Sequence, residues 1–170
     1  MTTWLKLKQP TTVWNGPGVE PCRHKYTHNI GSSQTVSEMI ANHIGKGTIH
    51  LVINCHGDPG PKLRIGPGIT PDDAERFTPI AGLSALKMIW MANCNLTYFP
   101  GGQDFCFNLA RITQCYVVAN YVAVANIRPP INCLEDTGYA MRSIYDPFGD
   151  MVKPDPFYDE LGPWAGFAKV

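Results

Sequence analysis

The sequence lacks the features that mark several large classes of protein. Its 14 basic and 14 acidic residues balance to a formal net charge of zero, and neither sign forms a run, so the basic patch of a nucleic-acid-binding protein is missing. No apolar stretch approaches the roughly 20 residues that cross a bilayer. The N-terminal stretch MTTWLKLKQP lacks the continuous apolar segment of a secretory signal. We therefore expect no nucleic-acid partner, no membrane insertion, and a cytoplasmic location or delivery into another cell as an effector.

The even number of cysteines permits disulfide bonds, but a chain of this length does not need a disulfide scaffold. The chain has six cysteines in 170 residues, and it can bury a core without crosslinks. Three of the six lie in apolar segments, where a thiol commonly packs as a small hydrophobic side chain; they are Cys55, Cys106 and Cys115. We therefore expect a protein with reduced cysteines.

The middle of the sequence contains apolar runs of strand length. They cover residues 48–55, 86–93 and 115–125, and such continuous runs are typical of strands that are buried on both faces of a parallel sheet. Helix patterns lie between and before these runs. This alternation predicts an α/β fold with a mostly parallel sheet and helices packed on its faces.

The expected helices have recognisable starts. Thr35 and Glu38 form a capping-box pattern ahead of an apolar helical face. A short helix is expected to begin at Thr70-Pro71, because proline suits the first helical position, and to end before Pro79. A third helix is expected over residues 103–114.

One domain is expected over residues 1–170. Its parts are an irregular N-terminal arm (1–31), an α/β core (32–125) and a C-terminal region rich in proline and aromatic residues (126–170). Turn residues predict short hairpins in two further segments, 57–69 and 143–153. The oligomeric state is not predicted by any of these patterns.

A histidine and a cysteine stand at the ends of two successive strand patterns. His56 and Gly57 follow the run 48–55, and Cys94 follows the run 86–93. The carboxyl ends of parallel strands lie at one edge of a sheet, where open α/β sheets bind ligands. A thiol needs a positioned base to become a nucleophile near neutral pH, and histidine is the usual base. The N–H groups of Gly57 and Cys94 can donate to an oxyanion, so the pattern predicts a nucleophilic cysteine site.

This order of motifs resembles the caspase-like, or clan CD, cysteine peptidases, which include caspases, legumain, gingipain, clostripain, separase and bacterial CHAT domains. The Cys-His-Gly sequence with its Gly/Pro-rich loop is most similar to the CHAT and other bacterial versions, and the resemblance covers roughly residues 34–125. It implies a caspase-like three-layer sandwich and a cysteine endopeptidase that forms an acyl-enzyme. By this resemblance, His56 is the general acid/base, Cys94 is the nucleophile and Gly57 N–H is part of the oxyanion hole. A protein or peptide is the implied substrate, and no metal or organic cofactor is required.

The resemblance also suggests substrate-binding residues. In relatives, the strand after the nucleophile helix and the segment beyond it help to form the specificity pocket, which corresponds here to Asn120 and Tyr121. Asn93 stands where the family usually has a small residue before the nucleophile. Asp58 can orient His56, but Asp-Pro-Gly is a common turn sequence, and the turn is the preferred interpretation.

Two other functions are compatible with the same residues. A different cysteine amidase or deamidase would use the same histidine and cysteine. A caspase-like pseudoenzyme that binds a partner protein would explain both Asn93 and the absence of a glycine shortly after Cys94. The second alternative predicts that Cys94 is unreactive.

A metal site is a weaker alternative. Cys22, His24 and His28 supply three possible ligands in a short segment, and Cys133 could complete a tetrahedral set. The paired spacings of structural zinc sites are missing, so a polar surface loop is the preferred interpretation. His50, in the middle of the first apolar run, is expected to pack in the core.

Overall fold

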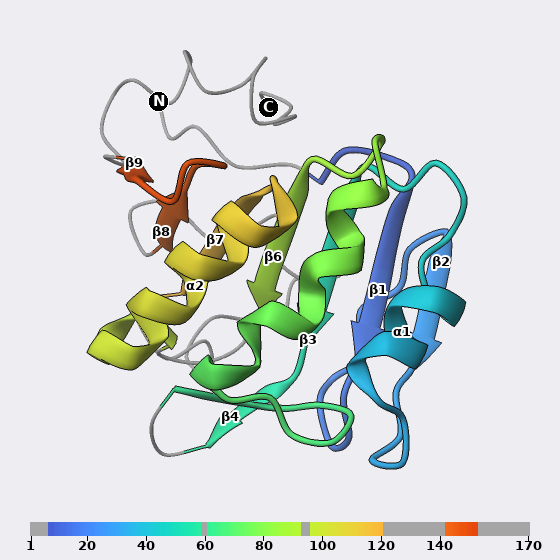
Figure 1. Cartoon of the computed structure of the whole chain (residues 1–170). Coiled ribbons are helices and arrows are strands. Elements are labelled where there is room, and N and C mark those ends of the chain that lie inside the picture. Colours follow the sequence, from blue (N-terminus) through green and yellow to red (C-terminus); the bar gives the residue numbers. More distant parts are fainter. Residues whose placement is uncertain (1–6, 59–60, 93–95, 121–141, 153–170) are drawn as a thin grey trace, which may run out of the picture.

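The structure, a computed structural model, describes residues 7–58, 61–92, 96–120 and 142–152 (Figure 1). A seven-stranded sheet lies at the centre of these residues. In spatial order its strands are β2 (Tyr26–Asn29), β1 (Thr11–Asn15), β3 (His50–Asn54), β6 (Met88–Ala92), β7 (Tyr116–Asn120), β8 (Arg142–Tyr145) and β9 (Met151–Val152). Neighbouring strands from β2 to β7 are parallel, whereas β8 and β9 pair antiparallel at one edge. The predicted mostly parallel α/β sheet is therefore confirmed.

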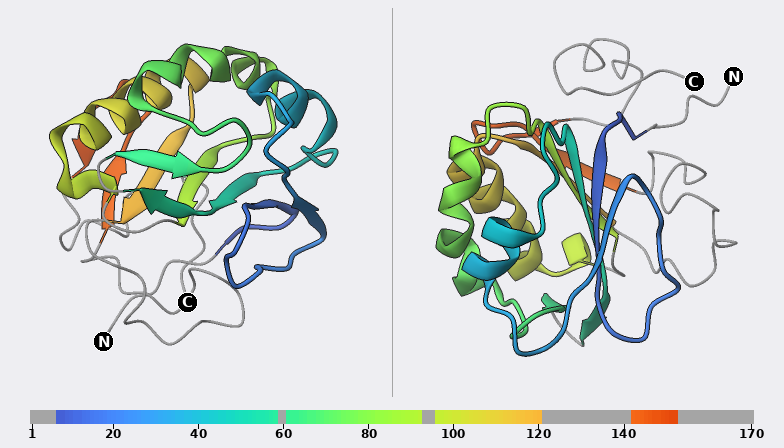
Figure 2. Two further views of the ribbon diagram at one scale, coloured as in Figure 1. Left: turned by 90° about the horizontal axis from the view of Figure 1, so that it is seen from below. Right: turned by 90° about the vertical axis from the view of Figure 1, so that its right-hand side faces the viewer.

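Three helical elements cover one face of this sheet. They are α1 (Val36–Asn42), the 3-10 helix η1 (Pro71–Gly82) and α2 (Pro100–Thr113), and Figure 2 (right) shows all three on the same side. A further short 3-10 helix, η2 (Leu96–Tyr98), follows β6. None of the helices in the described ranges combines the length and the hydropathy needed to cross a bilayer.

The other face differs from the expected helix layer. A three-layer sandwich places helices on both faces, but in the described part of the chain the three longer helical elements lie on one face only. The crossover from β1 to β2, residues 16–25, lies on the opposite face (Figure 2, right). Its sequence, GPGVEPCRHK, contains two prolines and two glycines, which disfavour a helix.

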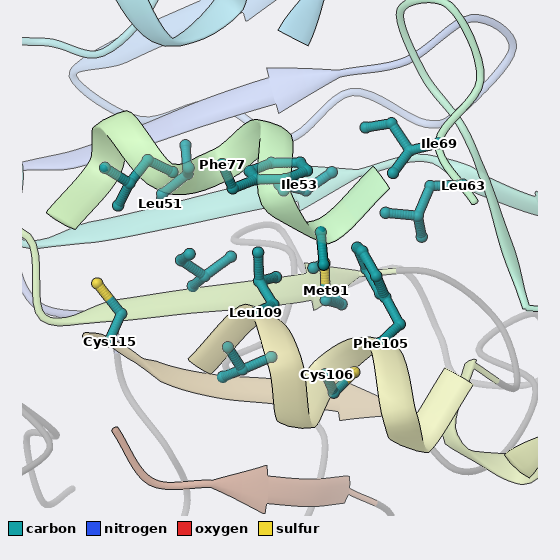
Figure 3. Close-up of a cluster of buried hydrophobic side chains, with 14 of the residues drawn as sticks. Leu51, Ile53, Leu63, Ile69, Phe77, Met91, Phe105, Cys106, Leu109 and Cys115 are labelled. Carbon is teal, nitrogen blue, oxygen red and sulfur yellow. The ribbon is translucent and has the colours of Figure 1, made fainter. Parts of the chain in front are cut away.

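The larger hydrophobic core lies between the sheet and the helices. Leu51 and Ile53 from β3 contact this core together with Phe77 from η1 and Phe105 and Leu109 from α2 (Figure 3). A second buried cluster lies on the opposite face and contains Val13, Val52, Trp90 and Val118. Because alternate residues of β3 enter the two clusters, this strand is buried on both faces, as its continuous apolar run predicts.

The start of α1 has the predicted capping box. The Thr35 hydroxyl accepts the Glu38 N–H at 3.2 Å, and the Glu38 carboxylate accepts the Thr35 N–H at 2.8 Å. The helix ends at Asn42, and the carbonyl of its C-cap, His43, accepts the Trp14 indole N–H at 2.7 Å. This bond ties the end of α1 to β1, the second strand from the edge of the sheet.

The N-terminal region is more regular than expected. Residues 1–31 were predicted to be an irregular arm, but β1 and β2 both lie in this range. All five residues of β1 are buried, and β1 pairs in register with β3. The prediction failed for two reasons. β1 is a segment of only five residues next to a proline, and β2, with the sequence YTHN, has no aliphatic side chain.

The helix that begins after Thr70 is longer than expected. Thr70 N–H donates to the Asp73 carboxylate at 2.7 Å, so the predicted start is correct. Pro79 does not end the element, which continues to Gly82. A proline ring clashes with the carbonyl four residues earlier in an α-helix, whereas η1 consists of 3-10 turns with a different hydrogen-bond geometry.

Both predicted hairpins are present. Strands β4 (His56–Asp58) and β5 (Lys62–Arg64) pair antiparallel directly after β3. Strands β8 and β9 pair around the turn from Asp146 to Asp150, where Asp146 N–H donates to the Asp150 carbonyl at 2.9 Å.

The chain reverses its winding direction between β1 and β3. From β1 it crosses outward to β2 on the helix-free face, and it then returns through α1 on the helical face to β3, on the other side of β1. The segments that follow β1 and β3 therefore leave the sheet edge in different directions. Such a reversal is the position at which open α/β sheets form a crevice outside the carboxyl ends of their strands.

Candidate active site

Strands β3 and β6 end side by side. They are parallel neighbours, and Asn54, the last residue of β3, is in register with Ala92, the last residue of β6. The expected juxtaposition of the two strand ends is confirmed. His56 follows β3 by two positions, and Cys94 follows β6 by two positions; Cys94 itself lies outside the described residues.

His56 belongs to the β4–β5 hairpin and not to a loop. Its side chain is exposed, and its backbone pairs with Arg64 of β5. The hairpin is anchored by Leu63, which is buried in the main core and exchanges two backbone hydrogen bonds with Ile69, at 2.8 and 3.0 Å (Figure 3). His56 therefore lies on a hairpin that is anchored in the core, at the carboxyl edge of the sheet.

The imidazole of His56 contacts the β1–β2 crossover. Its Nε2 lies 2.9 Å from the Gly18 carbonyl oxygen. A carbonyl oxygen only accepts hydrogen bonds, so Nε2 carries the proton. In the neutral ring, Nδ1 then has the free lone pair and is the atom that can accept a proton.

Gly18 suits this contact for two reasons. Its φ is +75°, a left-handed conformation that favours glycine. A Cβ on this residue would also lie 3.7 Å from two ring atoms of His56, so the crossover packs directly against the imidazole. The sequence analysis missed Gly18, and the only signal for it was the turn-rich sequence WNGPG, which spans the end of β1 and the start of the crossover.

Gly57 presents its N–H away from β5. The facing residue, Leu63, directs both its N–H and its carbonyl to Ile69. Gly57 and Leu63 therefore form a non-hydrogen-bonded pair of the antiparallel ladder, in which the backbone polar groups point outward. This geometry is compatible with the predicted role of Gly57 N–H as an oxyanion donor.

The other predicted substrate contacts are only partly described. Asn120 is the last residue of β7, the strand next to β6, so its backbone lies at the same sheet edge as the end of β6. Asp58 ends β4 and pairs with Lys62. Asn93 and Tyr121 lie outside the described residues.

The cysteines differ from the expected fully reduced set. Cys55, Cys106 and Cys115 are buried free thiols, as their apolar segments predict. Cys22, however, is disulfide-bonded, which corrects the expectation of a reduced chain. The argument from apolar segments did not apply to Cys22, because this residue lies in the turn-rich crossover. Cys133, like Cys94, lies outside the described residues.

Burial makes two of the free thiols poor nucleophiles. It raises the pKa of the Cys115 thiol to about 11 and that of the Cys106 thiol still further. A thiol with a raised pKa contains little thiolate near neutral pH. These two cysteines have a packing role.

The metal site considered from Cys22, His24 and His28 is not assembled. Cys22 packs in the cluster on the helix-free face, whereas His28 contacts His43 at the end of α1, with 3.3 Å between their Nδ1 atoms. His24 Nδ1 lies 3.2 Å from the side-chain nitrogen of Gln9. Across the described ranges, no group of three or more histidine, cysteine or acidic residues is arranged to hold a metal ion.

His50 is a core residue, as predicted. It is fully buried, and its Nδ1 accepts the Lys8 N–H at 2.9 Å. Its ring centroid lies 5.8 Å from that of Trp90. It therefore contributes to the cluster on the helix-free face and not to the sheet edge.

Two hollows of similar volume lie on the described surface. One, of about 530 Å³, lies between the β1–β2 crossover and the strands β1 and β2, and is lined by Asn15, Gly16, Val19, Pro21, Arg23, His24, Thr27 and Asn29. The other, of about 540 Å³, lies near the end of α2 and is lined by Glu75, Asn108, Arg111, Ile112, Gln114, Pro147 and Phe148. The first adjoins the crossover that contacts His56, so it lies nearer the candidate site.

Comparisons with protein-family models, with curated proteins and with solved structures found no match to this chain.

Proposed function

We propose that this chain is a cysteine endopeptidase of caspase-like fold, in which Cys94 is the nucleophile and His56 is the general acid/base. The observation that carries the proposal is the hydrogen bond from His56 Nε2 to the Gly18 carbonyl, at the strand end next to β6. It leaves Nδ1 as the ring atom that can accept a proton, on a hairpin that follows the strand next to β6. The mostly parallel sheet supports the fold part of the proposal.

The proposed reaction has two stages. The Cys94 thiol proton moves to His56 Nδ1 as the sulfur attacks the scissile carbonyl carbon. Gly57 N–H and Cys94 N–H donate to the tetrahedral oxyanion. His56 Nδ1 then gives its proton to the amine nitrogen as the C–N bond breaks, which leaves a thioester on Cys94.

Water completes the cycle. A water molecule loses a proton to His56 Nδ1 as its oxygen attacks the thioester carbonyl. The C–S bond then breaks and the proton returns to sulfur, so the carboxylic acid product leaves and the thiol is restored. Throughout both stages, Nε2–H stays on the Gly18 carbonyl, so the ring keeps one orientation.

Peptide cleavage tests the proposal. The purified chain is incubated with a diverse peptide library, and the products are sequenced by mass spectrometry. We expect internal cleavage by the wild type, and losses of at least about 100-fold in His56→Ala and Cys94→Ala. Cys115→Ala is the matched control, because Cys115 is a buried free thiol just before β7, at the opposite end of that strand from Asn120, and it should keep activity. Equal cleavage by Cys94→Ala and the wild type would contradict the proposal.

A further inference from the structure

Two asparagines join the ends of β1 and β3. Asn15 and Asn54 are the last residues of these strands, are in register with each other, and are 3% and 8% exposed. A buried amide is costly unless its polar atoms are hydrogen-bonded. The partners of these two side chains therefore show what the pair stabilises.

The partners lie in the β1–β2 crossover. The Asn54 amide nitrogen donates to Asn15 Oδ1 at 2.8 Å and to the Glu20 carbonyl at 2.9 Å. The Asn15 amide nitrogen donates to the Cys22 carbonyl at 2.9 Å, and Asn15 Oδ1 accepts the Cys22 N–H at 3.0 Å. The Asn15 side chain thus binds Cys22 on both of its backbone groups, as a neighbouring strand would.

The start of the crossover is fixed as well. Gly16 N–H donates to the Asn54 carbonyl at 2.8 Å. A Cβ on Gly16 would lie 2.8 Å from the Arg64 carbonyl oxygen, so the chain passes close to β5 here. Residues 17–19 therefore form a short span between Gly16 and Glu20, each of which is hydrogen-bonded to Asn54, and Gly18 lies at the centre of this span.

We infer that Asn15 and Asn54 are positioning residues for the candidate active site, an inference that rests on the proposed function. They hold the crossover at Glu20 and Cys22, and the crossover presents the Gly18 carbonyl to His56 Nε2. The carbonyl selects the Nε2–H tautomer and so leaves Nδ1 as the base. Neither asparagine touches the reacting atoms in this account.

The tautomer of His56 provides a direct test. Side-chain ¹⁵N NMR of histidine-labelled protein distinguishes the Nε2–H and Nδ1–H forms. We expect the wild type to have the Nε2–H form at His56, and Asn54→Ala to have a mixture of both forms. Asn29→Ala is the matched control, because Asn29 ends β2 at the same edge but is exposed, and it should keep the wild-type signal. A folded Asn54→Ala variant with an unchanged His56 tautomer would overturn the inference.

A second measurement needs no variant. Cys22 N–H donates to a buried side-chain oxygen, so we expect this amide to exchange with deuterium much more slowly than an exposed amide of the same crossover. Fast exchange at Cys22 in the wild type would also overturn the inference. This measurement remains decisive if Asn54→Ala does not fold.

These readouts separate the inference from the proposed function. If Cys94 is unreactive while Asn54→Ala changes the His56 tautomer, the peptidase proposal fails and the positioning role remains. If both hold, Asn54→Ala should reduce kcat by up to about 100-fold with little change in KM, because a misplaced catalytic group mainly affects the chemical step. A change confined to KM would contradict the positioning role.

Discussion

At the scale of single residues, one hydrogen bond distinguishes His56 from an ordinary exposed histidine. An exposed histidine at a strand end is compatible with many roles. The 2.9 Å contact between its Nε2 and the Gly18 carbonyl fixes which ring nitrogen carries the proton. In the proposed function, this contact holds the ring and leaves Nδ1 to act as the base toward Cys94.

The buried thiols give a first prediction at this scale. Burial raises the pKa of Cys115 to about 11 and raises that of Cys106, so we expect both to resist alkylation in the folded protein near neutral pH. Labelling of Cys115 should increase as the pH rises toward about 11, because the thiolate fraction then grows. Intact-mass analysis with peptide mapping measures both. Rapid labelling of either residue in folded protein near neutral pH would contradict their assignment to the core.

The disulfide bond of Cys22 gives a second prediction. A thiol nucleophile must be free, so the proposed function requires that Cys22 is linked to a cysteine other than Cys94. Proteolysis of unreduced protein followed by mass spectrometry identifies the linked peptides. A Cys22–Cys94 peptide as the main product in active preparations would contradict the proposal and favour the non-catalytic binding protein.

The sequence was informative about some residues and silent about others. The burial of Cys55 and His50, and the position of His56 just beyond the strand, could be predicted from where each stands relative to the apolar run 48–55. Gly18 could not, because its contact with His56 depends on β1 and β3 being neighbours and on the path of the crossover. Asn15 and Asn54 were missed for the same reason, since an asparagine at a strand end is also a common turn residue.

At the scale of elements, a chain of side-chain contacts joins β2 to α1. The Gln34 amide oxygen accepts Gly31 N–H at 3.2 Å, and the Gln34 amide nitrogen lies 2.5 Å from His43 Nε2. His43 Nδ1 lies 3.3 Å from His28 Nδ1. Because the amide nitrogen only donates, neutral His43 carries its proton on Nδ1 and donates it to His28.

This arrangement predicts a pH-dependent stability. Burial, and secondarily the nearby His43, lower the pKa of His28 below its usual 6.5. The folded state therefore disfavours protonation of His28. Neutral His28 therefore contributes to the free energy of unfolding above about pH 6.5. This contribution is lost as the pH falls through the lower pKa that His28 has in the folded state. Urea unfolding at several pH values measures it.

The matching variant is His28→Asn, with His24→Asn as the control. We expect His28→Asn to weaken the acid-dependent loss of unfolding free energy, because the residue that is unfavourable to protonate is gone. His24→Asn should retain the wild-type pH dependence. An identical pH dependence in His28→Asn and wild type would contradict the assignment.

The contact between η2 and α2 predicts a steric effect. A Cβ on Gly102, in the first turn of α2, would overlap the Leu96 carbonyl oxygen. We therefore expect Gly102→Ala to lower the free energy of unfolding by about 1–3 kcal/mol. Gly82→Ala is the control, because a Cβ there meets nothing within 4 Å. Thermal and urea unfolding measure both, and equal stability of the two variants would contradict the packing described.

Elements were predictable where one pattern dominates. The strands β3, β6 and β7 have continuous apolar runs, and α1 has its capping box, so the sequence alone identifies them. In contrast, β2 is recognisable only through its pairing with β1, because its four residues carry polar or aromatic side chains. Tertiary pairing decides such strands, which is why local patterns miss them.

At the scale of the whole molecule, the winding reversal between β1 and β3 organises the candidate site. It brings the crossover and the β4–β5 hairpin together at one sheet edge, although Gly18 and His56 are separated by 38 positions. In the described residues, the three longer helical elements lie on one face. The edge therefore combines a rigid sheet with two connecting segments, an arrangement that suits binding and catalysis.

The reactivity of Cys94 toward a thiol-directed electrophile tests the central claim most directly. The measurement is the rate of iodoacetamide labelling, resolved by residue, in wild type and His56→Ala between about pH 5 and pH 9. The account predicts that wild-type Cys94 labels faster than free cysteine near neutral pH and that His56→Ala removes this advantage. Labelling of Cys94 that is no faster than free cysteine, and that is the same in His56→Ala, would contradict the proposed peptidase.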